Sequence, residues 1–254
     1  MRIALTREVS DAIVACELTH LDRVVIDVDL ARRQHAVYET ALGTLGCQVM
    51  RLPPEPAMPD SVFVEDVAVV LDELAVVTRP GATSRRGETD SVAAALEPHR
   101  PLFTIEPPGT IEGGDVLRVG RTLFVGVSTR TNRSGLEQLR RIVSPFDYWV
   151  EPVEVAGALH LKSAITCVGE RTLLINRSWV DAFAFGDYDL IDVDPAEPFS
   201  ANALWVGGSV IYPEQCPCTR ALLESRGVQI VPVNVSELAK AEGGVTCCSV
   251  IFEA

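Results

Sequence analysis

The sequence predicts an α/β fold in which β-hairpins and helices repeat around a closed ring. Three observations predict it: pairs of apolar runs joined by tight turns recur along the chain, helical segments lie between many of them, and each chain end carries one unpaired apolar run. An open α/β sheet is the alternative, but its crossovers join single parallel strands and not antiparallel hairpins. We therefore expect a ring that closes by pairing its N- and C-terminal strands.

Four hairpins are predicted, and each begins directly after a polar residue. Each consists of an apolar run, a turn containing Gly or acidic residues, and a second apolar run. They cover residues 66–78, 115–125, 162–175 and 202–212. Cys247 precedes a fifth apolar run, and the five opening residues stand 49, 47, 40 and 45 residues apart. The partner expected for this last run is residues 2–6, because their pairing removes two exposed strand edges.

Helical segments with recognisable ends separate these hairpins. Apolar periodicity and stop signals predict helices over residues 29–45, 88–96, 134–143 and 218–225. A Gly or Pro follows each segment within two residues, and both residue types end helices. The chain therefore alternates sheet and helix around the expected ring.

Composition excludes several classes of protein. The 254 residues include 22 Lys and Arg against 35 Asp and Glu, a net charge of −13, so we expect no nucleic-acid partner, although a small cationic ligand is compatible. Seven cysteines without paired CxxC motifs predict neither a disulfide scaffold nor a structural zinc site. No apolar run suggests a signal peptide or a membrane span. We expect a cytoplasmic protein with no membrane partner.

The opening residues of the hairpins should meet at one mouth of the ring. The stretches just before them hold several carboxylates, His160 and Cys247. Taken singly, a His or a Cys is more often a packed side chain than a reactive one. Their recurrence at equivalent points of a repeat instead favours a shared site.

Six short motifs occur in an order that is specific when they are taken together. They are Pro-Asp-Ser-Val-Phe-Val-Glu-Asp at 59–66, Thr-Arg-Pro-Gly-Ala at 78–82 with Ser-Arg-Arg at 84–86, Glu-Gly-Gly-Asp at 112–115, Arg-Thr-Asn at 130–132, Leu-His-Leu-Lys at 159–162 and Gly-Val-Thr-Cys at 244–247. Over nearly the whole chain they resemble the dimethylargininase (dimethylarginine dimethylaminohydrolase) family of guanidino-group-modifying enzymes. The resemblance implies one catalytic domain over residues 1–254 with the five-bladed α/β propeller, or pentein, fold.

The same resemblance implies an activity and its catalytic residues. The expected reaction is hydrolysis of asymmetric dimethylarginine or monomethylarginine to citrulline and dimethylamine or methylamine, with no cofactor and no metal. Because a guanidinium carbon is a poor electrophile, this chemistry needs a strong nucleophile and an acid for the leaving amine. The resemblance assigns Cys247 as the nucleophile that forms a covalent thiouronium intermediate, His160 as the acid and later the base, and Glu112 as the group that orients His160.

The substrate-binding residues implied by the resemblance divide according to the charge that they meet. Asp66, with Glu112, faces the guanidinium, and Glu65 lies in the substrate-lining motif. Arg85 and Arg130 clamp the α-carboxylate, since a planar guanidinium offers paired hydrogen bonds. Asp60 meets the α-amino group, with backbone contacts from Leu18 and Ala241.

Two details concern the thiols. Cys247 and Cys248 would point to opposite faces of a strand, and only the resemblance selects Cys247. The acidic residues expected around it should disfavour the thiolate in the empty enzyme, so that a cationic substrate supplies the missing positive charge.

For Asp115 we expect a structural role in its hairpin.

Three alternatives remain beside this interpretation. Arginine deiminase chemistry on unmethylated arginine comes next, although those enzymes generally carry a helical insertion for which this chain has no room. Amidino transfer is a third activity. A ring that only binds arginine-like metabolites is a rival from a different class, and a homodimer is compatible with each.

Overall fold

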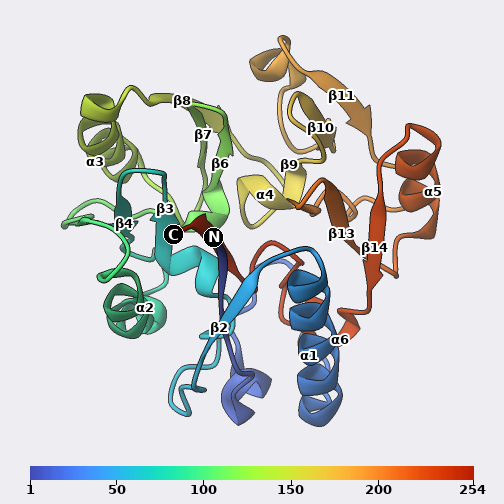
Figure 1. Ribbon diagram of the computed structural model, residues 1–254, viewed down its shortest axis with the longest axis horizontal. Coiled ribbons are helices and arrows are strands. Elements are labelled where there is room, and N and C mark those ends of the chain that lie inside the picture. Colours follow the sequence, from blue (N-terminus) through green and yellow to red (C-terminus); the bar gives the residue numbers. More distant parts are fainter.

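Five three-stranded sheets surround a common centre in the computed structural model, which describes residues 1–254 (Figure 1). Each sheet is one blade of the ring. The blades are β15 (Val250–Glu253), β1 (Arg2–Arg7) and β2 (Gln48–Leu52); β3 (Ala68–Val70), β4 (Ala75–Val77) and β5 (Leu102–Thr104); β6 (Val116–Val119), β7 (Thr122–Val127) and β8 (Trp149–Glu154); β9 (Ile165–Cys167), β10 (Thr172–Ile175) and β11 (Asp189–Asp192); and β12 (Leu204–Val206), β13 (Ser209–Pro213) and β14 (Ile230–Val233).

The structure confirms the predicted hairpins and the closure of the ring. The pairs β3–β4, β6–β7, β9–β10 and β12–β13 are all antiparallel. The chain ends also pair antiparallel, with Arg2 opposite Glu253 and Leu5 opposite Val250, and the two termini lie side by side (Figure 1). The first blade therefore takes strands from both ends of the chain, which joins its beginning to its end.

Each blade also contains a third strand that the sequence pattern did not reveal. β2, β5, β8, β11 and β14 each pair in parallel with the strand that precedes the crossover. These outer strands form one edge of their sheets, and β2 and β5 hold no fully buried residue. Because such a strand has no continuous apolar face, the alternation that marks the hairpins is missing from it.

The crossovers contain the predicted helices. α1 (Val28–Thr44), α2 (Thr89–Leu96), α3 (Arg133–Val143) and α5 (Pro217–Ser225) each precede an outer strand, and their ends fall within one residue of prediction. Gly46 and Gly227 follow α1 and α5 with positive φ, the conformation that ends helices most easily at glycine. Two one-turn helices, α4 (Leu161–Ala164) and α6 (Ser236–Ala239), complete the set, and the β10–β11 crossover holds only a 3-10 turn at Ala182–Phe185.

Short helical turns come directly before the first strand of several blades. A 3-10 turn at Val64–Val67 precedes β3, a second at Gly113–Asp115 precedes β6, and α4 precedes β9. Residues 245–248 form a turn before β15, so the expectation that Cys247 and Cys248 lie on a strand was wrong. These turns bring the polar residues of the motifs to one end of the ring.

The core consists of several apolar clusters lying between neighbouring blades. The largest joins 20 buried residues, among them residues of α1, β1, the β12–β14 blade, α6 and the segment before β15. Hence the turn that carries Cys247 rests on helix α1, which lies some 200 residues earlier in the chain. No helix is both long and apolar enough to pass through a bilayer.

Candidate active site

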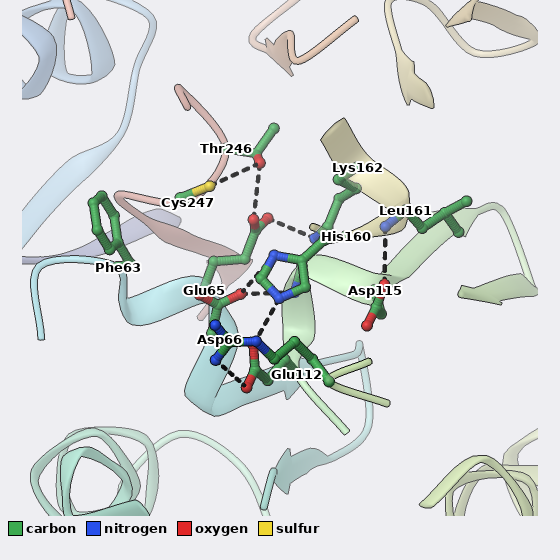
Figure 2. Close-up of polar contacts among 12 residues, drawn as sticks. Phe63, Glu65, Asp66, Glu112, Asp115, His160, Leu161, Lys162, Thr246 and Cys247 are labelled. Carbon is green, nitrogen blue, oxygen red and sulfur yellow. Dashed lines mark hydrogen bonds and ion pairs between the residues drawn. The ribbon is translucent and has the colours of Figure 1, made fainter. Parts of the chain in front are cut away.

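A small buried cavity gathers most of the predicted site residues. Its volume is about 20 Å³, and eight of the ten predicted residues line it. They are Asp60, Asp66, Arg85, Glu112, Arg130, His160, Ala241 and Cys247. Phe63, Leu159, Glu17, Glu242 and Gly243 complete the lining. Figure 2 shows the acidic side chains and the imidazole meeting from separate turns of the chain.

His160 and Glu112 form a buried ion pair. Nε2 of His160 lies 2.6 Å from Oε2 of Glu112, and the Glu112 side chain is fully buried (Figure 2). Burial alone would lower the pKa of His160, but Asp66, Glu112 and Asp115 together raise it to about 9. Burial likewise opposes ionisation of Glu112, yet the hydrogen bond and charge of His160 bring its pKa down to about 2. The imidazole is therefore protonated at neutral pH and can serve as an acid.

Asp66 is held between a backbone amide and Arg85. Its Oδ1 accepts a hydrogen bond from the Gly114 amide at 3.1 Å and lies 3.8 Å from Nδ1 of His160. Its Oδ2 accepts from Nη1 of Arg85 at 2.6 Å. A Cβ at Gly114 would come within 2.7 Å of both Asp66 and His160, so the motif needs a glycine at this point.

Cys247 sits in a turn that hydrogen bonds hold on several sides. Its carbonyl oxygen accepts from the Glu65 amide at 3.1 Å, and its sulfur lies 3.4 Å from the Gly244 amide. Burial first, and then the charges of Glu65 and Asp66, raise the pKa of the Cys247 thiol to about 12. Burial is the larger cause, and the acids act in the direction that the sequence predicted, against the thiolate in the empty site.

The two adjacent cysteines occupy different environments. Cys247 lines the cavity, whereas Cys248 is buried in the largest apolar cluster and its pKa lies well above the usual value because of that burial. Of the two thiols, Cys247 is the one placed beside the acids and the imidazole.

The two arginines of the predicted carboxylate clamp differ in their contacts. Arg85 is buried and donates to Asp66, to Glu88 and to the carbonyl oxygens of Asp60 and Phe63. Its contacts do not support the predicted role on an α-carboxylate, because every nitrogen already has a protein partner. The guanidinium of Arg130 donates a hydrogen bond only to Thr19, at 3.0 Å, and lies 3.7 Å from Glu112, which leaves donors for a ligand.

Two predicted residues lie outside the cavity lining. Glu65 binds Lys162 at 2.5 Å and Thr246 at 2.8 Å (Figure 2). All three residues line a second cavity of about 360 Å³ between the inner strands. Its side chain is therefore not placed as a substrate contact in this structure. Leu18 packs against the largest apolar cluster, while its neighbour Glu17 reaches the cavity.

The loop after Cys16 closes the cavity from outside. Oε1 of Glu242 accepts hydrogen bonds from the amides of Thr19, His20 and Leu21 at 2.5–3.0 Å, and the Glu17 amide donates to Asp60. The cavity of about 20 Å³ shares Leu159, Glu242, Gly243 and Cys247 with another cavity of about 310 Å³, which His20 and Leu21 of the same loop also line.

Sequence reasoning missed several residues that build the site. Lys162 and Asn202 were treated only as hairpin openers, yet Asn202 Oδ1 accepts from the Thr246 amide at 3.1 Å. Glu242 adopts a positive φ of 58° beside Ala241. Their polar character beside the motifs was the available signal, but only the folded chain shows their partners.

One group of side chains has the spacing of metal ligands. Donor atoms of Asp66, Glu112 and His160 all lie within 4.8 Å of one another. All three are committed to hydrogen bonds or ion pairs within the protein, Asp66 to Arg85 and Glu112 to His160. Their arrangement suits proton transfer beside a cation-binding carboxylate.

The chain is similar in sequence to known proteins. The family described as N,N dimethylarginine dimethylhydrolase, eukaryotic, matches residues 20–253. The N(G),N(G)-dimethylarginine dimethylaminohydrolase of Pseudomonas aeruginosa is 36% identical over 228 residues, 89% of this chain and 90% of that protein. The protein of the same name from Streptomyces coelicolor is 37% identical and covers 97% of this chain and 95% of its own.

Solved structures agree in fold. A cysteine-to-serine mutant of the Pseudomonas aeruginosa enzyme complexed with citrulline superimposes with a TM-score of 0.93 at 34% identity, covering 98% of both chains. The N-terminal domain of a cyanobacterial arginine dihydrolase reaches a TM-score of 0.88 at 20% identity, a likeness of fold alone. The chain has the α/β-propeller fold of these proteins, with five small sheets, and it belongs to the dimethylarginine dimethylaminohydrolase family.

Proposed function

We propose that this protein hydrolyses asymmetric dimethylarginine and monomethylarginine to citrulline, releasing dimethylamine or methylamine. One observation carries the proposal: Cys247, His160 and two carboxylates, Asp66 and Glu112, line one buried cavity. Its relatives are named for the same reaction, and one of them was crystallised with citrulline. The site therefore contains the nucleophile, the acid and the cation partners that the reaction requires.

Substrate recognition follows from the charges in the cavity. The guanidinium cation meets Asp66, and the α-carboxylate meets the donors of Arg130 that the protein leaves free. Asp60 and the backbone of Leu18 and Ala241 surround the α-ammonium group. The loop containing Leu18 opens to admit the substrate and then excludes water.

The first half of the reaction breaks a C–N bond. The substrate cation lowers the pKa of the Cys247 thiol, which releases its proton to solvent, and the thiolate sulfur then attacks the guanidinium carbon to form a C–S bond. Nε2 of His160 is held by Glu112, so Nδ1 is the atom that protonates the departing amine. The amine leaves with that proton, and a thiouronium group stays on Cys247.

The second half restores the enzyme. His160, now neutral, accepts a proton from a water molecule as its oxygen attacks the thiouronium carbon. The C–S bond then breaks, the sulfur of Cys247 leaves with the bonding electrons, and the proton lost by the new hydroxyl group returns Cys247 to the neutral thiol. The product carries the new oxygen as the ureido carbonyl of citrulline. Glu112 keeps the imidazole in place and favours its charged form through both steps.

Other features fit this proposal. We propose that residues 1–254 act as one catalytic domain, since the site draws on residues from Asp60 to Cys247. All seven cysteines are free, which fits a location in the reducing cytoplasm.

The proposed partner is a small-molecule substrate. The net charge of −13 is unsuited to binding nucleic acid, and a homodimer is compatible with the site.

A substrate panel tests the proposal. Citrulline formation should be measured from asymmetric dimethylarginine, monomethylarginine and arginine at equal concentrations. We expect both methylated substrates to react and arginine to react more slowly. Faster turnover of arginine would instead identify a deiminase, and transfer of the amidino group without hydrolysis would identify a transferase.

A further inference from the structure

Behind Arg85, on the side away from the cavity, lies a buried carboxylate that the proposed mechanism does not use. Oε1 and Oε2 of Glu88 each lie 3.2 Å from Nε of Arg85, and Oε2 also accepts from Nη2 at 2.9 Å. The side chains of Glu88, Arg85 and Asp66 are only 3%, 5% and 4% exposed. Water therefore screens these three charges very little.

The three side chains alternate in charge toward the cavity. Arg85 lies between Glu88 and Asp66, and its Nη1 is 2.6 Å from Oδ2 of Asp66. If Arg85 paired with Asp66 alone, the buried pair would be neutral, and a guanidinium substrate would gain little from approaching Asp66. With Glu88 ionised, the trio carries one net negative charge, which is available to a cation.

We propose that Glu88 is a positioning residue for the proposed methylarginine reaction. It takes up one edge of the Arg85 guanidinium and balances its charge, so that Asp66 remains able to bind the substrate cation. This inference rests on the proposed function and extends it to a residue that does not line the cavity. The observable consequence of this role is selectivity, because Glu88 strengthens binding of a cationic ligand but not of a neutral one.

The surroundings of Glu88 make this effect depend on pH. Burial raises its pKa to about 7, while Arg85 acts in the opposite direction. The other charged groups that face it are Asp60, Asp66 and, from β1, Arg7. Glu88 thus gains its charge as the pH rises through neutrality, and affinity for a cation should rise with it.

Two ligands with the same amino-acid backbone and different charge separate charge from structure. In a Cys247→Ser background, calorimetry would measure the Kd of asymmetric dimethylarginine, a cation, and of citrulline, its neutral product. We expect Glu88→Gln to weaken binding of the cation roughly tenfold, the size of one pKa unit of interaction, and to leave citrulline nearly unchanged. Glu88→Asp, which keeps the charge, should restore most of the lost selectivity.

Glu97→Gln is the matched control. Glu97 is exposed, directly follows α2, and is not among the groups that shift the pKa of Glu88. Removing its charge should leave the ratio of the two affinities unchanged. A Glu88→Gln protein that loses both ligands equally, or neither, would overturn the proposal.

A second measurement needs no substitution at Glu88. In the Cys247→Ser protein, the ratio of cation to citrulline affinity should rise about fivefold between pH 6 and pH 8, because Glu88 is already partly ionised at pH 6 and not fully ionised at pH 8, and a flat ratio contradicts the proposal. Failure of the proposed function looks different: the Cys247→Ser protein would then bind neither ligand, and the wild-type protein would release no citrulline.

Discussion

The carboxylates of the site act in opposite ways on its two reactive side chains. Asp66 and Glu112 raise the pKa of His160 to about 9, which keeps the imidazole charged at neutral pH. Burial, with Glu65 and Asp66, raises the pKa of Cys247 to about 12, which keeps the thiol neutral. The empty site therefore holds a protonated imidazole and a neutral thiol, and a bound cationic substrate lowers the pKa of the thiol so that the thiolate forms.

A bound cationic ligand should lower the apparent pKa of the Cys247 thiol by a measurable amount. An inert guanidinium or amidinium ligand, placed between Asp66 and Cys247, is expected to lower the apparent pKa of Cys247 by one unit or more, because a nearby opposite charge favours the thiolate roughly to that extent. Thiolate absorbance against pH, with and without ligand, would measure it. Citrulline serves as the neutral control, and a cation that left the pKa unchanged or higher would refute the idea.

Removing the charge of Glu112 should shift the pH profile in a defined direction. His160 acts as an acid in its protonated form, so kcat/KM should fall as pH rises through about 9. Glu112→Gln removes an opposite charge at 2.6 Å, so the pKa of His160 falls and the alkaline decline begins roughly one to two units lower. The pH dependence of kcat/KM, which reports the free enzyme, measures this shift, and Glu137→Gln on the surface of α3 is the control.

At the scale of elements, helix α1 and the Cys247 turn form one unit. The Tyr38 hydroxyl on α1 donates to the carbonyl oxygen of Val245 at 2.8 Å, and Ser249 Oγ donates to the Tyr38 oxygen at 2.7 Å. Tyr38 is buried, so neither bond competes with water. One hydroxyl thus holds both sides of the turn that presents the nucleophile.

Tyr38→Phe tests this support with little change in volume. The substitution leaves the Val245 carbonyl oxygen buried without a donor, which costs about 1–3 kcal/mol of folding free energy. We expect kcat to fall several-fold, while KM for asymmetric dimethylarginine changes little, because the substrate cation binds elsewhere. Urea unfolding and steady-state kinetics would measure both effects. A rise in KM with kcat unchanged would instead assign Tyr38 to substrate binding.

At the scale of the whole molecule, the pairing of β1 with β15 closes the ring. Besides the strand ladder, the Ala254 amide donates to the Met1 carbonyl oxygen at 2.7 Å. Val250 and Phe252 of β15 are buried in an apolar cluster with Ile3 and Leu5 of β1. The two chain ends are therefore as firmly placed as any internal connection.

A circular permutant should retain the fold. Joining Met1 to Ala254 by a short flexible linker and opening the chain between Gly169 and Glu170, in the exposed β9–β10 turn, preserves every blade. Activity is expected to stay within about threefold of wild type, since exposed turns tolerate new termini. Circular dichroism and the citrulline assay would check this. Deleting residues 250–254 instead should unfold the protein, because β1 would lose its partner.

Much of the architecture could be predicted from local pattern. The hairpins after Asp66 and Asp115 follow from alternation and turn residues, and helix α1 from its period and from Gly46. The outer strands β2 and β5 could not be predicted, because they are short and largely exposed edges. Their pairing depends on where the preceding helix returns the chain.

The amino-acid sequence by itself determined the repeat, the closure of its ends and the residue types that converge at one mouth. Only the tertiary structure decided which partner each side chain has: Arg85 lies between Asp66 and Glu88, Glu65 pairs with Lys162, and Cys247 faces the cavity while Cys248 lies in the core. Periodicity reports which face of an element is apolar and so depends on near neighbours along the chain. The charge partners of a buried group come from distant segments, and their positions exist only once the ring has closed.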